Sequence, residues 1–166
     1  MTALEVRPAN ERDLAPLNAL YNHYVETSPA TFDIRPSTLE QRRVWFRQFA
    51  GTGRHRLFVA WRGEAFVGYS CSHEFRAKDA YETSVETTVY VAAERAGEGI
   101  GRALYAALFD SLVGEDVHRA YAGITQPNDA SEALHRRFGF EPIGTFEEVG
   151  RKEGRYWSVG WWQKRL

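Results

Sequence analysis

Ser84-Val-Glu-Thr-Thr-Val-Tyr-Val91 is followed, three residues later, by Arg95-Ala-Gly-Glu-Gly-Ile-Gly-Arg102 and then by Ala103-Leu-Tyr-Ala-Ala107. The first segment is dense in β-branched and aromatic residues, which predicts a β-strand. The last continues an apolar helical spacing that begins at Ile100, which predicts a helix with one apolar face. Three alternate glycines therefore lie in a turn from a strand to a helix.

This glycine turn is suited to an anion. Glycine lets the backbone approach a ligand, and the first N–H groups of a helix have no partner within it, so a pyrophosphate is the expected occupant. A P-loop would need Lys and then Ser or Thr after the last glycine, where Arg102-Ala103 stand. A dinucleotide-binding fold would need Gly-x-Gly-x-x-Gly, and Gly97-x-Gly99-x-Gly101 has another spacing. Taken alone, the turn also fits a glycine-rich connection that binds nothing.

Composition limits the class of protein. The 166 residues, 43% hydrophobic and 14% aromatic, predict a single globular domain over residues 1–166. A net charge of −1 argues against a nucleic-acid partner. Because there is neither a signal-like start nor a long apolar run, we expect no membrane contact and a cytoplasmic location. The single cysteine, Cys71, excludes a disulfide within the chain and a cysteine cluster for a metal, and is expected to be a small buried hydrophobe.

The other segments predict the order of the remaining elements. Strands are expected at residues 4–8, 57–61, 66–75, 84–91, 117–124, around 149 and at 156–162. Helices are expected after an Asn10 cap, after a capping box at Ser37–Glu40 with Val44, Trp45, Phe46 and Phe49 turned inward, from Ile100, and over Asn128–Phe138. This order predicts an α/β domain with a mixed central sheet, helices on both faces, and the anion site at the carboxyl end of the central strand.

Several separated motifs carry a family resemblance. Val89-Tyr-Val91, the glycine turn and Asn128-Asp-Ala-Ser-Glu-Ala-Leu-His-Arg-Arg-Phe-Gly-Phe140 resemble the GNAT superfamily of N-acetyltransferases. Others look like its phosphinothricin and methionine sulfoximine acetyltransferase subgroup: Tyr21-Asn-His23, Thr31-Phe-Asp33, Glu40–Phe46, Phe75-Arg76, Val85-Glu86, Ala122-Gly-Ile124 and Val159-Gly-Trp-Trp-Gln163. The likeness runs nearly end to end. It implies transfer of acetyl from acetyl-CoA to the amino group of a small amino-acid-like substrate, without a metal.

The resemblance also implies where acetyl-CoA binds. The residues expected to hold it are Val89, Tyr90, Val91, Ala96, Gly97, Glu98, Gly99, Ile100, Gly101, Arg102 and Asn128. In a splayed sheet, main-chain groups of the central strand lose their ladder partners and can pair with the amides of the pantetheine arm. The glycines would receive the pyrophosphate, with Arg102 as counter-charge. Ala96 departs from the Gln or Arg usual in the family, so its N–H or the neighbouring Arg95 would serve, and the Glu98 side chain should point to solvent.

Glu86 and His135 are the candidates for proton transfer. Only a free amine can attack a thioester, so the ammonium form must lose a proton, and Glu86 would act as base, act through water or hold the ammonium. A Glu86 that merely faces solvent or an ion-pair partner is the alternative. His135 stands where the superfamily often has a tyrosine that protonates the leaving thiolate, although a lone helical histidine is also typical of structural or surface positions.

For the acceptor, Arg76 offers a planar fork to a carboxylate, with a solvated charge at the strand end as the alternative. The resemblance places Phe75, Arg76, Glu86 and Thr87 at the acceptor substrate, and Phe32 on a loop that covers this substrate. Rival functions are acetylation of another amine, such as a peptide terminus, a polyamine or an antibiotic, or a non-catalytic acyl-CoA sensor. Trp157, Trp161 and Trp162 are many aromatics for the last strands, which suggests that one or more lies in a subunit contact, and the resemblance implies a homodimer because such relatives are commonly dimers.

Overall fold

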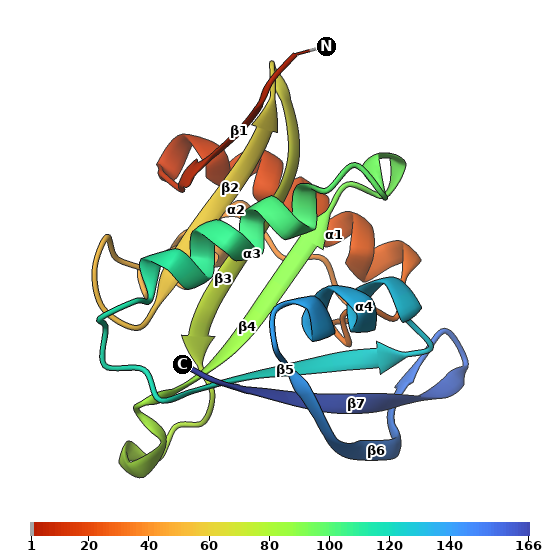
Figure 1. The fold of residues 1–166 in the computed structure, drawn as a ribbon. Coiled ribbons are helices and arrows are strands. Elements are labelled where there is room, and N and C mark those ends of the chain that lie inside the picture. The colour runs from red at the N-terminus through yellow and green to blue at the C-terminus, as the bar shows by residue number, and fades with distance from the viewer. Residues whose placement is uncertain (1) are drawn as a thin grey trace.

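The computed structural model describes residues 2–166, and its seven strands form one mixed sheet in the order β1-β2-β3-β4-β5-β7-β6 (Figure 1). The strands are β1 Leu4–Pro8, β2 Arg56–Arg62, β3 Ala65–Glu74, β4 Ser84–Val91, β5 Arg119–Gln126, β6 Glu141–Lys152 and β7 Arg155–Arg165. All neighbours pair antiparallel except β4 and β5, which run parallel.

Helices cover both faces of the sheet (Figure 1). They are α1 Leu14–Thr27, α2 Leu39–Phe46, α3 Ile100–Ser111 and α4 Asp129–Arg137. The apolar face of α3 buries Leu104 and Leu108 against the sheet, and α1 buries Leu17 on the opposite side beside Val59 and Tyr69. The expected fold class, a mixed sheet with helices on both faces, is confirmed. In residues 2–166, no helix has both the length and the apolar character needed to cross a membrane.

The two parallel strands, β4 and β5, are paired only at their first residues. β4 and β5 pair only from Ser84 with Arg119 to Glu86 with Tyr121. Beyond Glu86 the strands diverge, and the sheet opens at the carboxyl end of β4 (Figure 1). The splay expected for the central strand is therefore present, and it lies between the glycine turn and α4.

Two predicted details of the second helix are wrong. The capping box joins Thr38 to Gln41 rather than starting at Ser37, with Gln41 N–H donating to Thr38 Oγ1 and Thr38 N–H to Gln41 Oε1. Ser37 is not free to cap, because its main chain and hydroxyl bond the α1 side chains Asn18 and Asn22. Val44 is exposed, since α2 is short and presents a narrow face to the core.

The C-terminal hairpin also differs from the expectation. The sequence signals a strand only around residue 149, whereas β6 extends over 141–152 with two register irregularities that break its alternation. The three tryptophans are engaged within the fold rather than exposed. Trp162 is buried in the core, Trp161 lines a cleft, and Trp157 donates its indole N–H to the Lys152 carbonyl.

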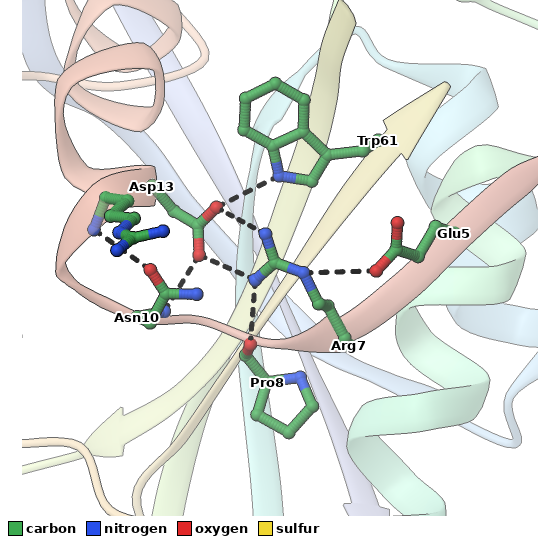
Figure 2. Close-up of polar contacts among 7 residues, drawn as sticks. Glu5, Arg7, Pro8, Asn10, Asp13 and Trp61 are labelled. Carbon is green, nitrogen blue, oxygen red and sulfur yellow. Dashed lines mark hydrogen bonds and ion pairs between the residues drawn. The ribbon is translucent and has the colours of Figure 1, made fainter. Parts of the chain in front are cut away.

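A buried acid fixes the start of α1 against the sheet (Figure 2). Asp13 is 1% exposed, and its carboxylate accepts two hydrogen bonds of 2.8 Å from the Arg7 guanidinium. It also accepts from Asn10 N–H and the Trp61 indole N–H. Burial alone would raise the pKa of Asp13, but the bonds from Arg7 and Asn10 outweigh it and hold the pKa below its ordinary value. The expected Asn10 cap is confirmed, on a 3₁₀ turn that precedes α1.

Candidate active site

A cleft of about 850 Å³ opens where β4 and β5 separate. It is lined by the end of β4, the glycine turn, α4, and the loop between α1 and α2. Most residues predicted for the site line it together: Phe32, Glu86, Thr87, Val89, Tyr90, Val91, Ala96, Gly97, Gly99, Ile100, Gly101, Arg102, Asn128 and His135. Residues far apart in the sequence thus meet in one hollow.

Main-chain groups at the end of β4 face this opening. Ala92 N–H donates to the Val67 carbonyl of β3. Since bonded and non-bonded pairs alternate along an antiparallel ladder, Val89 and Val91 turn their N–H and C=O groups away from β3, toward the space that β5 has left. The Val91 carbonyl accepts a hydrogen bond from the Tyr24 hydroxyl. The main-chain N–H and C=O groups of Val89 are therefore the most available on this edge for hydrogen bonds to a ligand.

The three glycines of the turn serve two purposes. Gly97 and Gly99 adopt φ values of +83° and +78°, which disfavour a side chain, and nothing lies within 4 Å of where a Cβ would be. Gly99 is the N-cap of α3, whose first turn contains no acidic residue. At Gly101 a Cβ would lie 3.2 Å from Leu134 Cδ2, so this glycine allows α3 to pack closely on α4. The turn leaves the helix N-terminus open to an anion.

The charges around the turn also suit an anion. Arg95 and Arg102 line the cleft. Glu98 does not line it, and pairs instead with Arg62 at 3.3 Å and Arg95 at 3.4 Å. The negative charge expected to conflict with a phosphate is thus directed away and compensated.

Glu86 is a half-buried carboxylate without a partner. Within residues 2–166 it makes no hydrogen bond or ion pair that meets ordinary distance criteria, although it lines the cleft. Burial raises the pKa of Glu86 above its ordinary value, and the positive charge of Arg76 offsets part of that increase. A carboxylate of this kind is suited to accept a proton near neutral pH.

His135 is bonded on both ring nitrogens. Its Nδ1 lies 2.7 Å from the Ser131 carbonyl, which can only accept, so Nδ1 carries the hydrogen. Nε2 then accepts from the Tyr105 hydroxyl at 2.9 Å. Burial lowers the pKa of His135, so the ring is neutral near pH 7, and the Tyr105 hydroxyl also lies 3.4 Å from Thr87 Oγ1. Tyr105 was not predicted, because its position on the apolar face of α3 indicates a core residue.

Of the two polar atoms in the Asn128 side chain, only the oxygen is engaged in a hydrogen bond. Its Oδ1 caps α4 by accepting the Ser131 N–H at 3.1 Å, while the residue still lines the cleft. The amide NH₂ therefore remains as a donor toward the opening.

Phe75 and Arg76 are not brought into this cleft. Phe75 stacks on Tyr121 with ring centres 4.3 Å apart. Arg76 is exposed, lies over the Phe75 ring, and lines a second cavity of about 310 Å³ together with Ser84. Ser84 is two residues before Glu86 on the same face of β4, so the two cavities are neighbours along that strand.

Comparisons with known proteins agree with this geometry. Residues 6–161 match a family model described as an acetyltransferase (GNAT) domain. The chain is 56% identical to a phosphinothricin N-acetyltransferase of Streptomyces coelicolor, covering 98% of this chain and 96% of the relative. It is 32% identical to an L-methionine sulfoximine/L-methionine sulfone acetyltransferase of Pseudomonas aeruginosa, over 97% and 94% of the two chains. A crystal structure of a phosphinothricin acetyltransferase from Sinorhizobium meliloti with acetyl-CoA superimposes with a TM-score of 0.92 at 30% identity, covering 100% and 89% of the chains.

Proposed function

The chain belongs to the GNAT acetyltransferase family and is an acetyl-CoA-dependent N-acetyltransferase, and we propose that its acceptor is a small amino-acid-like amine of the phosphinothricin or methionine sulfoximine type. The observation that carries the chemistry is the unpartnered carboxylate of Glu86 in the cleft between β4 and β5. The end-to-end similarity to relatives named for these acceptors supports the substrate class. We further propose that residues 1–166 act as a single domain; the cytoplasmic location remains a prediction.

The residues present fit acetyl-CoA. The main-chain groups of Val89 and the N–H of Val91 suit the pantetheine amides, and the open turn at Gly97 and Gly99 suits the pyrophosphate. The other residues to which we assign contacts with the cofactor line the same cleft: Tyr90, Ala96, Ile100, Gly101, Arg102 and Asn128. We assign no direct contact to the Glu98 side chain, because it does not line the cleft and pairs with Arg62. When bound, acetyl-CoA supplies an electrophilic thioester carbon and a thiolate leaving group.

Side chains of the cleft provide the groups for proton transfer. Glu86 takes the proton of the acceptor ammonium, directly or through water, or holds the ammonium in place; its raised pKa favours the role of base. Tyr105 and His135 form one hydrogen-bonded unit in which His135 Nε2 fixes the direction of the Tyr105 hydroxyl. His135 has no free N–H to offer, so we propose that the Tyr105 hydroxyl would turn its single hydrogen from His135 Nε2 to the leaving thiolate, with Thr87 as a further neighbour.

We keep Arg76 as the proposed partner of the acceptor carboxylate. Its positive charge already acts on Glu86, and the cavity that it lines is next to the cleft along β4. Phe75 would position Arg76 from below rather than touch the acceptor, because its ring is stacked on Tyr121. Phe32 lines the cleft from the covering loop.

A thiol-release screen tests the substrate class. It compares phosphinothricin, methionine sulfoximine, methionine sulfone, ordinary amino acids, spermidine and an aminoglycoside, with wild type and Arg76→Ala. We expect carboxylated analogues to be preferred, and Arg76→Ala to lower their kcat/KM by roughly ten- to a hundredfold. Activity confined to spermidine or the aminoglycoside would refute the acceptor class. Acetyl-CoA binding without turnover of any amine would instead indicate a sensor.

We propose a homodimer formed through β6, the outer strand of the sheet. Ile143, Phe146, Val149 and Tyr156 on this hairpin are each more than half exposed, at 52%, 51%, 54% and 57%. An apolar edge strand of this kind is suited to a second copy of the chain. Light scattering should give the mass of two chains, and Phe146→Glu should reduce it to one; a monomeric wild type would refute the proposal.

A further inference from the structure

Lys152 lies at the tip of the β6–β7 hairpin, with its ammonium buried against the loop between α1 and α2. The residue is 6% exposed, and Nζ donates to the Ser28 carbonyl at 2.7 Å and to the Thr31 carbonyl at 2.8 Å. These bonds join residues more than 120 positions apart. Burial lowers the pKa of Lys152, with nearby Glu153 and Asp33 acting in the opposite direction.

The same hairpin supports a side chain of the cleft. A Cβ added at Gly150 would lie 2.2–2.6 Å from three ring atoms of Phe32, so the Phe32 ring rests directly on the Gly150 backbone. Ala30, Thr31 and Phe32 are the loop residues that line the cleft. Lys152 and Gly150 therefore hold this wall of the cleft from outside.

The loop is also held from the side of α1 and β4. The Tyr21 hydroxyl lies 2.9 Å from Thr31 Oγ1 and donates to Asp33, and the Tyr90 hydroxyl donates to the Ala30 carbonyl. The Lys152 bonds complete this arrangement. A buried carbonyl without a donor is costly, and an ammonium shared by two carbonyls restricts the loop to a narrow geometry.

None of these contacts involves the glycine turn. The atoms that Lys152 and Gly150 touch belong to residues 28–32, whereas the proposed pyrophosphate contacts are at residues 97–102. Disturbing the contact between the hairpin and the loop should therefore affect the binding of the acceptor amine and not that of acetyl-CoA.

We propose that Lys152 is a positioning residue that fixes the 28–32 loop and Phe32, and thereby determines the affinity and selectivity for the acceptor amine. The inference rests on the proposed N-acetyltransfer and on an acceptor bound beside Phe32. Lys152 itself touches neither substrate.

The test compares Lys152→Met, which keeps the aliphatic length but removes the donors, with Lys152→Arg, which retains them. Lys164→Met is the matched control, since Lys164 lies on β7 over the Phe109 ring, away from the loop. Gly150→Ala displaces Phe32 without changing the ammonium, and serves if Lys152→Met does not fold. The measurements are the KM for each substrate, kcat, and amide hydrogen exchange of residues 28–36.

We expect Lys152→Met to lower kcat/KM for the acceptor by on the order of ten- to a hundredfold, with KM for acetyl-CoA within about twofold of wild type. Loop exchange should rise, Lys152→Arg should recover part of the acceptor effect, and Lys164→Met should change neither quantity. Equal losses for both substrates, or faster loop exchange with unchanged acceptor constants, would overturn the proposal. If wild type acetylated no amine, the proposed function would fail by itself, while unchanged loop exchange in Lys152→Met would still refute the positioning of the 28–32 loop by Lys152.

Discussion

Replacing Glu86 by Gln removes a charge and a base while nearly preserving shape. Glu86 has no hydrogen-bond or ion-pair partner within residues 2–166, so the change breaks no structural contact there. Amino groups have pKa values of about 8 to 10, so that roughly a tenth to a thousandth of the acceptor is free amine at pH 7. A positioned base typically contributes about 10²- to 10⁴-fold. We therefore expect kcat at pH 7 to fall by roughly that factor.

The assay is thiol release with saturating acetyl-CoA between pH 6 and 9.5. The deficit of Glu86→Gln should narrow as pH rises, because more acceptor is already deprotonated in solution, and the KM for acetyl-CoA should stay constant. Glu64→Gln is the control, since Glu64 is exposed in the β2–β3 turn outside the cleft. Unchanged turnover at pH 7 would refute both the base and the ammonium anchor.

Thermal stability provides a second, independent readout. Because the pKa of Glu86 is raised in the folded chain, the folded state binds the proton more tightly than the unfolded state. Stability associated with this group is complete below the unfolded pKa and is lost as pH rises through the folded one. Glu86→Gln should therefore raise Tm at pH 7, and the gain should vanish below about pH 4. A lower Tm at pH 7 would show that the carboxylate has a stabilising partner.

Three other substitutions test separate parts of the structure. Gly99→Val places a β-branched residue at φ +78°, a strain of about 1–3 kcal/mol, and should weaken acetyl-CoA binding at least about tenfold by calorimetry; a folded variant with wild-type affinity would exclude the phosphate site. Tyr105→Phe leaves His135 Nε2 without its donor and should lower kcat more than either KM, whereas unchanged kcat would make the pair purely structural. Asp13→Asn should lower the free energy of unfolding in urea by about 3 kcal/mol at pH 7, because it breaks a buried pair with Arg7. The pKa of Asp13 is depressed, so that this difference should shrink as pH falls below about 4; a constant difference would refute the charge effect.

Local signals were sufficient for the centre of the molecule. The strand Ser84–Val91, the glycine turn and the helix from Ile100 are each specified by residues within a few positions of one another, and the structure has them at the expected places. The β4–β5 splay could be expected only with the family resemblance, because nothing within either strand signals where their pairing ends after Glu86.

Contacts between distant residues account for what the sequence did not indicate. Lys152 is one polar residue in a turn by sequence, and its importance depends on carbonyls of Ser28 and Thr31. Tyr105 is one of several large residues on an apolar helix face. Its hydroxyl is recognised as part of the site only from its hydrogen bond to His135, 30 positions later. Arg76 is expected at the acceptor carboxylate, but it lies outside the cleft, over a Phe75 ring that is stacked on Tyr121, a residue about 45 positions later.

Asp13 and Glu86 show why burial alone does not identify a functional carboxylate. Both are withdrawn from water, and burial acts on each in the direction of a higher pKa. Arg7 and Asn10 reverse the effect at Asp13, so that its charge is fixed and structural. At Glu86 the effect persists, because distant Arg76 offsets only part of it. A fold that leaves a carboxylate half-buried and unpartnered loses stability there, and such a loss is expected where a group must remain free to take a proton. The lack of bonding partners, more than the depth of burial, therefore favours Glu86 as the acid-base group of this cleft.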